Sequence, residues 1–540
     1  MKKFVLLNGK VYVGRGVFAQ AVYAEDGVIR CVGTDSEALA AAGGGAETAD
    51  CEGRTVIPGL NDSHCHQVSV GINMSQLNVS GTRSAGEITE RGRKFLAGHP
   101  ELCRNGIAGR GWNQDLFTED RRVPDRHDLD RITTDVPIVL RRVCGHIAVV
   151  NTKALDMMGM DRTDPPEFEG GTFEREADGH PNGVLTELLV GRAGSLIPPY
   201  GAGEYEKMYE RAANYAVEHG VTTVQSNDAG SLPVPLETMF SVINNVHAGR
   251  RTLLRYRHQL TFRNAAEFKK YLESEAFARR REGDPHVEFG PLKLFKDGSL
   301  GGRSALMRQD YADDPGNRGV EVLSGEEMDA LCKLAADAGV QVTTHAIGDR
   351  AVADTISSYE RTMKPGNPLR NIVNHCQITD RALLERMARD NICVAYQPIF
   401  LDYDMHITES RCGPELASTS YAFGTLDRMG VHIGYGTDAP VEDSNPFPNI
   451  CCAVTRTDKE GWPKGGWFPA ERVDVETAVD AYTAGSAWLE FHEQDKGRIR
   501  PGFLADMTVL DTDIFTCDPG RIRDILPTMT VIGGEVAYRR

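Results

Sequence analysis

Two histidines one residue apart end the stretch Pro58-Gly59-Leu60-Asn61-Asp62-Ser63-His64-Cys65-His66, which follows the apolar run 55–57. Residues i and i+2 of a β-strand point to the same face, so His64 and His66 can bind one metal ion while Cys65 faces away from it. The alternative is one buried, hydrogen-bonded histidine and one solvated histidine, and an isolated His-x-His pattern favours that alternative. The rest of the chain therefore decides how this stretch is interpreted.

The composition is that of a soluble globular protein. The chain has 540 residues, of which 41% are hydrophobic and 25% charged, so it is long enough for two or three structural units. The net charge of −17 argues against a nucleic acid or an anionic membrane as a partner, because both require a basic face. No apolar stretch approaches the ~18 residues of a membrane span.

The N-terminal residues and the cysteines indicate the compartment. The apolar run 4–7 ends at Asn8-Gly9-Lys10, which makes it shorter than a signal peptide requires and predicts a first strand instead. The twelve cysteines are scattered without a Cys-x-x-Cys motif, as is typical of reduced thiols. We therefore expect a cytoplasmic protein.

The sequence predicts β-strands at both ends of the chain and a long α/β region between them. Residues 1–56 and 490–540 alternate short strand-like runs with glycine turns, which predicts one β-sandwich domain built from both ends. Residues 57–489 form the middle, in which the region from about 67 to 215 lacks a regular strand and helix alternation. We predict that this region is an inserted subdomain that covers the mouth of the site.

Eight strands can be counted in the middle of the chain, most of them separated by helical patterns. They begin near residues 57, 221, 252, 287, 340, 371, 392 and 431. One intervening helix starts at the capping box Ser324-x-x-Glu327 and stops at Gly339, and another helical pattern covers 474–489. This count and alternation predict a distorted (β/α)8 barrel of the α/β class.

Potential metal ligands stand at the C-terminal ends of these strands, where barrel enzymes place their chemistry. They are His64, His66, His345, His375 and Asp438. Only 15 of the 540 residues are histidines, so four of them at strand ends of one ring favour a metal site. Imidazoles and carboxylates are usual ligands of a divalent ion such as zinc.

The chemical roles of Asp438 and Lys293 each have two interpretations. Asp438 can act as the general base, and the alternative is a helix N-cap after the last strand. Lys293 and Lys296 lie on opposite faces of their strand. A lysine that points into the barrel mouth either pairs with the site carboxylates or is chemically modified, because an unpaired buried ammonium is costly.

Five motifs together resemble the amidohydrolase superfamily, and more narrowly its branch of N-substituted formamide deformylases (amidohydrolase family 3). They are Pro-Gly-x-x-Asp-Ser-His-x-His at 58–66, Leu-Lys-Leu-Phe-x-Asp-Gly-Ser-Leu-Gly at 292–301, His-Ala-Ile-Gly-Asp at 345–349, Gly-Thr-Asp-Ala-Pro-Val at 436–441 and Asp-Lys-Gly-x-Ile-x-Pro-Gly-x-x-Ala-Asp at 495–506. The resemblance spans nearly the whole chain and is specific for family rather than for substrate.

The resemblance implies one or two divalent ions, most simply zinc. His64, His66 and Asp438 would hold one ion, and His345 and His375 a second. Lys293 matches the position that many members carboxylate at its side-chain nitrogen to bridge two metals. Family features near the substrate pocket are also implied, and a structural role is an equal alternative for each of them: Trp112, Gly145-His146, Arg303 and Gln397.

The function expected from these residues and the resemblance is a metal-dependent hydrolase of non-peptide carbon–nitrogen bonds in a small molecule. The bond would belong to an amide, an N-formyl group or a cyclic imide or ureide, attacked by metal-activated hydroxide with Asp438 as general base. One alternative is a mononuclear deaminase of a heterocycle, and another is a non-catalytic scaffold or regulator on the same fold. Superfamily members are often dimers, so the resemblance also allows a homodimer.

Overall fold

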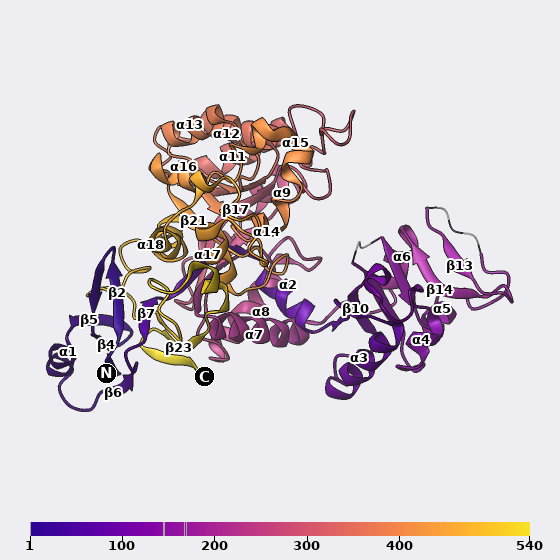
Figure 1. The fold of residues 1–540 in the computed structure, drawn as a ribbon, viewed down its shortest axis with the longest axis horizontal. Helices are drawn as coiled ribbons and strands as arrows, with labels where there is room; N and C mark the ends of the chain where they lie inside the picture. Colours follow the sequence, from indigo (N-terminus) through magenta and orange to yellow (C-terminus); the bar gives the residue numbers. More distant parts are fainter. Residues whose placement is uncertain (1, 144–145, 167, 169) are drawn as a thin grey trace. The chain divides into compact units, whose positions relative to one another are not determined.

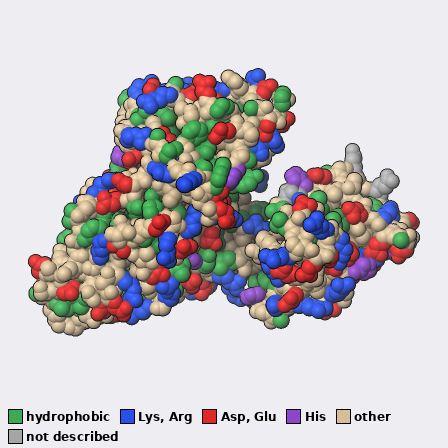
Figure 2. Space-filling model, in the orientation of Figure 1, with side chains coloured by type: hydrophobic (Ala, Val, Ile, Leu, Met, Phe, Trp, Pro, Cys, Tyr) green, Lys and Arg blue, Asp and Glu red, His purple; other side chains and the backbone are tan. Residues whose placement is uncertain are grey.

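The computed structural model describes residues 2–143, 146–166, 168 and 170–540 (Figure 1). The chain divides into two compact units, one combining Met1–Ser69 with Ala212–Arg540 and the other consisting of Val70–Arg211. Acidic and basic side chains are interspersed on the visible surface (Figure 2). No helix in the described ranges is both long enough and apolar enough to cross a membrane.

Eight parallel strands form the central sheet of the first unit in the order β21-β20-β19-β18-β17-β16-β15-β8. The strands are β8 (Leu60–Cys65), β15 (Val221–Ser226), β16 (Arg255–Leu260), β17 (Val287–Phe295), β18 (Val342–Ala346), β19 (Ile372–His375), β20 (Cys393–Tyr396) and β21 (Ile433–Tyr435). Backbone hydrogen bonds close the ring between its end strands, because Asp438 N donates to His64 O at 2.8 Å and His66 N donates to Ala439 O at 2.7 Å. The predicted (β/α)8 barrel is therefore confirmed.

Helices connect the barrel strands in chain order. They are α2 (Gln67–Met74), α7 (Ala202–Glu218), α8 (Leu236–Ala248), α9 (Ala265–Leu272), α10 (Glu275–Ala278), α11 (Gly325–Ala338), α12 (Asp349–Thr362), α13 (Arg381–Asp390), α14 (Phe400–Asp404), α15 (Thr408–Ala417) and α16 (Phe423–Arg428). Helix α11 begins and ends where its sequence predicts. The Ser324 side chain caps it by accepting from Glu327 N, and Gly339 ends it with a φ of +67° that favours glycine.

A π-helical turn divides the helical pattern that the sequence places at 474–489. The segments after β21 are α17 (Pro446–Thr455), η2 (Pro469–Glu471), α18 (Val475–Asp480), the π-helix η3 (Ala481–Gly485) and α19 (Ser486–Leu489). A side chain at Gly485 would lie 2.2 Å from the Ile433 carbonyl oxygen, so glycine allows this segment to approach β21 closely. The sequence pattern predicted a helix over these residues but not the π-helical turn within it.

Two further sheets in the first unit contain the strands from the chain ends. One has the order β5-β4-β1-β6 and the other β24-β23-β22-β7-β2-β3. Their elements are β1 (Lys3–Leu7), β2 (Lys10–Gly14), β3 (Val17–Ala19), β4 (Ala21–Glu25), β5 (Val28–Gly33), α1 (Asp35–Ala42), β6 (Glu47–Asp50), β7 (Thr55–Pro58), β22 (Met507–Leu510), η4 (Pro519–Asp524), β23 (Pro527–Ile532) and β24 (Glu535–Arg539). Strand β7 pairs in parallel with β2 and antiparallel with β22. One hydrophobic core joins both ends and includes Phe4, Val56, Met507 and Val531.

The second unit is built around its own six-stranded sheet, in the order β13-β14-β12-β11-β10-β9. Its elements are β9 (Leu77–Asn78), α3 (Ala85–Gly98), β10 (Ile107–Trp112), η1 (Gln114–Leu116), α4 (Arg126–Asp130), β11 (Ile138–Arg142), β12 (Ile147–Val150), α5 (Thr152–Met157), β13 (Phe173–Arg175), β14 (Pro181–Thr186) and α6 (Leu188–Gly194). It has hydrophobic clusters of its own, one around Ile88, Trp112 and Leu140 and one around Leu155 and Leu185. This unit lies within the region where the sequence predicts an insertion.

Candidate metal centre

The barrel gathers the six predicted metal-site residues at the C-terminal ends of its strands. His64 lies on β8, His66 directly after it, Lys293 on β17, His345 on β18, His375 at the end of β19 and Asp438 after β21. Asp438 Oδ1 lies 3.2 Å from His64 Nε2 and 3.3 Å from His66 Nε2. Lys293 Nζ lies 3.2 Å from His64 Nε2.

The remaining two histidines pack beside this group. The ring centroids of His345 and His375 are 4.4 Å apart, and those of His64 and His375 are 5.6 Å apart. One ligand atom each from His64, His375 and Asp438 lie within 4.8 Å of one another, a spacing that could hold one ion. His345 Nε2 donates to the Gly298 carbonyl at 3.0 Å, which leaves a lone pair on Nδ1 of the neutral ring.

Two of the imidazoles are held by acceptors at their Nδ1 atoms. His64 Nδ1 lies 2.8 Å from Gln259 Oε1, and the Gln259 amide is oriented because its Nε2 donates to the Ser63 carbonyl at 3.1 Å. His66 Nδ1 lies 2.7 Å from the Asn227 carbonyl oxygen. Both Nδ1 atoms must therefore carry the proton, which leaves a lone pair on each Nε2 of the neutral rings.

His375 has the same arrangement. Its Nδ1 lies 2.7 Å from Gln397 Oε1, and the Gln397 amide Nε2 donates to the Ala395 carbonyl at 3.3 Å. The neutral ring again offers its Nε2 as the free acceptor. An imidazole fixed in this way at Nδ1 is the usual form of a histidine that binds a metal through Nε2.

Asp438 Oδ1 shows that these residues fit a divalent cation. This buried oxygen has no hydrogen-bond partner in the described part of the chain, although two Nε2 atoms face it. Lone pairs and a carboxylate oxygen repel one another at such distances unless a proton or a cation lies between them. Neutral imidazoles with one carboxylate are a donor set suited to zinc.

Burial controls the charge states in the cluster. Burial lowers the pKa of His64 to about 3 and that of His345 to about 4, and the charge of Lys293 acts in the same direction. Burial also lowers the pKa of Lys293 to about 7, although Asp438 opposes it. Burial alone would raise the pKa of Asp438, but its histidine neighbours hold it well below its usual value. Burial would lower the pKa of His66 as well, but its contact with Asp438 raises it. At neutral pH the cluster thus contains an ionised carboxylate beside the neutral imidazoles of His64, His345 and His375.

Asp62 is a supporting residue to which the sequence analysis assigned no role. Its Oδ1 accepts from the backbone amides of His64 and Thr437, both at 3.1 Å, and its Oδ2 accepts from the Thr437 hydroxyl at 2.5 Å. It therefore connects β8 to the segment that carries Asp438. Its position two residues before His64 is the sequence feature that could have identified it.

Asp297 is a second such residue. It accepts from the backbone amides of Leu306, Ile347 and Gly348 at 2.8–3.1 Å, and burial raises its pKa to about 7. The carboxylate thereby anchors the backbone that follows His345. Asp297 stands in the motif at 292–301, but nothing in that motif identified its partners.

The structure bears on the roles predicted for Asp438, Cys65 and Lys296. Asp438 is not a helix N-cap, because the next helix, α17, is capped by Asn445. The Cys65 sulfur lies 3.8 Å from Gln67 Oε1, and Cys65 is not part of the group that could hold a metal. Lys296 Nζ contacts Glu321 Oε1 and the Leu323 carbonyl, on the face of β17 opposite to Lys293, as predicted.

The predicted substrate-binding residues lie in different environments. Gln397 contacts His375, as described above. Arg303 forms a two-point ion pair with Asp313, with N–O distances of 2.7 and 3.2 Å.

The other two belong to the second unit. Trp112 is buried and donates from Nε1 to the Leu140 carbonyl at 2.9 Å, which accounts for a structural role. His146 is exposed and lies 3.2 Å from Glu187. Gly145 lies outside the described residues.

A (β/α)8 barrel with histidines and an aspartate at the C-terminal strand ends defines a class of enzymes that bind a metal at this face. Residues 47–538 match the profile of the Amidohydro_3 family, described as "Amidohydrolase family", and the chain belongs to this family.

Relatives of known sequence or structure match over almost the whole chain. The protein YtcJ of Bacillus subtilis (strain 168) is 32% identical over 100% of both chains. The N-substituted formamide deformylase of Arthrobacter pascens is 25% identical over 100% of this chain and 99% of its own. The crystal structure of an uncharacterized metal-dependent hydrolase from Pyrococcus furiosus superposes with a TM-score of 0.77 at 26% identity, covering 95% of this chain and 100% of that one.

Proposed function

We propose that the protein is a metal-dependent hydrolase of non-peptide carbon–nitrogen bonds in small molecules, such as amides, N-formyl groups and cyclic imides or ureides. The observation that carries this proposal is the approach of the His64 and His66 Nε2 atoms to Asp438 Oδ1 at 3.2 and 3.3 Å. The similarity to an N-substituted formamide deformylase supports the N-formyl group as the first substrate to test.

One or two divalent ions, most simply zinc, would be held by the four histidines together with Asp438. When bound, such an ion lowers the pKa of a water molecule and polarises a carbonyl oxygen. Lys293 is buried, and its lowered pKa of about 7 leaves part of it as an uncharged amine at neutral pH. We propose that the nitrogen of this amine bonds to the carbon of carbon dioxide and releases one proton to solvent, and that the resulting carbamate would serve as a further ligand.

Asp438 would move the proton in this reaction. Its Oδ1 faces the imidazoles, which leaves Oδ2 for proton transfer. As the oxygen of water bonds to the carbonyl carbon, Asp438 takes the proton that water loses. The same proton passes to the nitrogen when the carbon–nitrogen bond breaks, so an N-substituted formamide yields formate and an amine.

The test is a product assay on the zinc-loaded enzyme. N-benzylformamide should release formate and benzylamine in equal amounts, and the Asp438→Asn variant serves as the matched control that should release neither. Cytosine and adenine are assayed in parallel for ammonia. Ammonia from a heterocycle with intact formamides would establish a deaminase instead, and protein that binds no zinc, manganese or cobalt would favour the non-catalytic alternative.

A further inference from the structure

A pocket of about 150 Å³ lies among β16, β17, the segment before β18 and helices α9 and α10. We name it the arginine pocket; its lining includes Arg257, Arg280 and Arg281 with the aromatic residues Phe268, Tyr271 and Phe277. Gln341, which precedes β18, also lines it, whereas His345 of the metal centre lies near the other end of that strand. The lining of the arginine pocket also includes Leu260 at the end of β16 and Leu292 of β17, but none of the six candidate metal ligands.

Arg257 is the buried charge of this pocket. The residue is 6% exposed, and its guanidinium makes one long side-chain hydrogen bond within the described part of the chain, from Nη2 to Gln341 Oε1 at 3.4 Å. Its Nε and Nη1 atoms are buried without a hydrogen-bond partner in the described ranges. A buried guanidinium that lacks acceptors is costly, so an acceptor supplied from outside the chain would stabilise it.

Two carboxylates near Arg257 form no ion pair with it. Glu288 accepts from His492 at 2.9 Å, and Glu490 pairs with Lys496 through Oε1 at 2.7 Å, while its buried Oε2 has no hydrogen-bond partner among the described residues. Burial lowers the pKa of Arg257, while the charges of Glu490 and Glu288 act in the opposite direction from a distance. The lining of the arginine pocket itself contains three arginines and no aspartate or glutamate.

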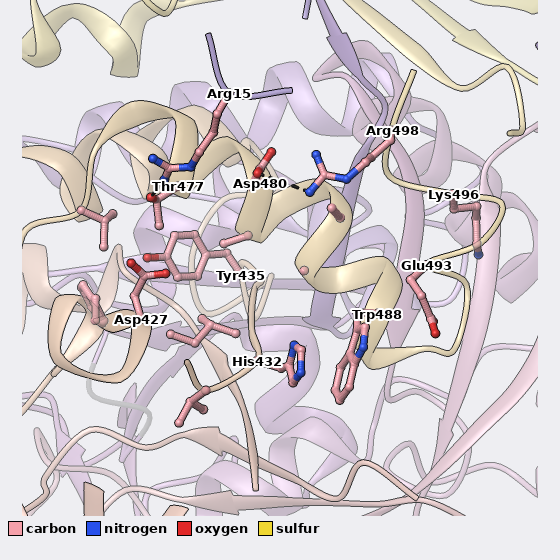
Figure 3. Close-up of a pocket in the computed structure, with 17 residues that line it drawn as sticks. Arg15, Asp427, His432, Tyr435, Thr477, Asp480, Trp488, Glu493, Lys496 and Arg498 are labelled. Carbon is pink, nitrogen blue, oxygen red and sulfur yellow. Dashed lines mark hydrogen bonds and ion pairs between the residues drawn. The ribbon is translucent and has the colours of Figure 1, made fainter. Parts of the chain in front are cut away.

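A second pocket of about 380 Å³ in the same unit differs in its charges (Figure 3). Its Arg498 lies 3.5 Å from Asp480, as the dashed line marks, and its Lys496 pairs with Glu490 at 2.7 Å. Both of these cationic side chains therefore have an acidic partner within the protein. The lining of the arginine pocket, by contrast, contains arginine and aromatic side chains but no acidic residue.

We propose that the arginine pocket binds a small organic carboxylate with an aromatic body, separately from the metal centre. A cavity of about 150 Å³ lined by apolar side chains is large enough to hold one benzene ring. The ring would pack against Phe268, Tyr271 and Phe277, and the carboxylate would supply the acceptors that Arg257 lacks. The exposed Arg281 would add charge at the pocket.

The experiment is calorimetric titration of the zinc-loaded, full-length protein with phenylacetate, and with uncharged 2-phenylethanol as the matched ligand control. We expect saturable 1:1 binding of phenylacetate, and at least tenfold weaker binding of the alcohol. Arg257→Met and Arg281→Gln should each weaken phenylacetate binding, Arg257→Met by tenfold or more. The control Arg279→Gln should bind as the wild type does, because Arg279 pairs with Glu275 and Glu282 and does not line the pocket.

The metal centre is the competing site for a carboxylate, so it is tested separately. Phenylacetate should bind Asp438→Asn with unchanged affinity, and a crystal of the complex should show the ligand beside Arg257. No saturable binding to the wild type would overturn the proposal, as would affinity that both arginine substitutions leave unchanged. If Arg257→Met does not fold, the exposed Arg281→Gln variant and the crystal decide the outcome.

Discussion

Single acceptors determine which nitrogen of each histidine faces the centre. Gln259, the Asn227 carbonyl and Gln397 each accept a hydrogen bond from Nδ1 of one imidazole. Because the two glutamine amides are themselves oriented by backbone carbonyls, the tautomers are set before any ion binds. The cluster is therefore preorganised at the level of individual hydrogen atoms.

Replacing Gln397 tests this preorganisation. Gln397→Leu removes the acceptor for His375 Nδ1 and should weaken zinc binding by about 10–100-fold, as loss of such supporting contacts does in other metal sites. Gln397→Glu keeps an acceptor at the same place and should stay close to the wild type. Zinc affinity measured by competition with a chelating dye compares the three proteins, and equal affinity for all would contradict the role.

Asp438→Asn tests the general base. The amide cannot take a proton from water, so kcat should fall by about 10³-fold or more. The barrel should stay folded, since Asp438 N still donates to His64 O. Steady-state kinetics are measured with circular dichroism and bound zinc as controls, and near-normal turnover in a folded, loaded variant would refute the assignment.

Strand alternation explains how one element serves two purposes. Strand β17 directs Lys293 to the metal centre, and Lys296, the first residue after this strand, contacts Glu321. At the start of the same strand, Glu288 reaches His492 in the segment after α19. The strand thus contributes to the chemistry near one end and to a polar contact near the other.

The Glu288–His492 pair predicts a pH-dependent contribution to stability. Burial would raise the pKa of Glu288, but the hydrogen bond from His492 and the charge of Lys496 lower it to about 2 from 4.5, so its contribution is lost as pH falls from 4.5 towards 2. Burial would lower the pKa of His492, but the bond to Glu288 raises it above 6.5, so its contribution is complete below 6.5 and is lost as pH rises through the raised pKa.

The coupling between these two side chains should therefore be greatest between pH 4.5 and 6.5. A double-mutant cycle with Glu288→Gln and His492→Asn, followed by urea unfolding at several pH values, measures it. The expected coupling is about 1 kcal/mol or less, because Glu288 is partly exposed. A coupling that does not change between pH 5.5 and pH 8.5 would count against this pair.

At the scale of the whole molecule, a buried ion pair joins the barrel to the segment that enters the terminal sheet. Arg255 of β16 contacts Asp506, which precedes β22, with N–O distances of 2.7 and 3.1 Å. Asp506 also accepts from Gly533 N at 2.7 Å. Both charged residues are less than 10% exposed, so little of either is in contact with water.

Arg255→Met should destabilise the first unit by about 3–5 kcal/mol, because it leaves the Asp506 carboxylate buried without its partner. The double variant Arg255→Met with Asp506→Asn should recover part of this loss, since no buried charge remains. Urea unfolding of the three proteins measures the effect. If the double variant is as unstable as the sum of its single variants, desolvation of the lone charge is not the cause.

Much of the fold could be predicted from local patterns. Strand-like runs separated by helical patterns, the cap at Ser324 and the stop at Gly339 are properties of neighbouring residues, and together they predicted the barrel strands and helix α11. The π-turn at 481–485 could not be predicted in this way, because it reflects the close approach of Gly485 to Ile433 on another element. The candidate ligands were predictable because they stand at strand ends.

The sequence by itself thus determined the order of the barrel strands and the residue types at their C-terminal ends, because both depend on short-range spacing. Only the tertiary structure decided which acceptor holds each imidazole: Gln259 lies 195 residues from His64 in the chain. It alone also left Arg257 Nε and Nη1 buried without an acceptor in the described part of the chain, while Nη2 donates to Gln341 from another strand connection. Such contacts arise when distant segments close into one barrel, and no local pattern in the sequence encodes them.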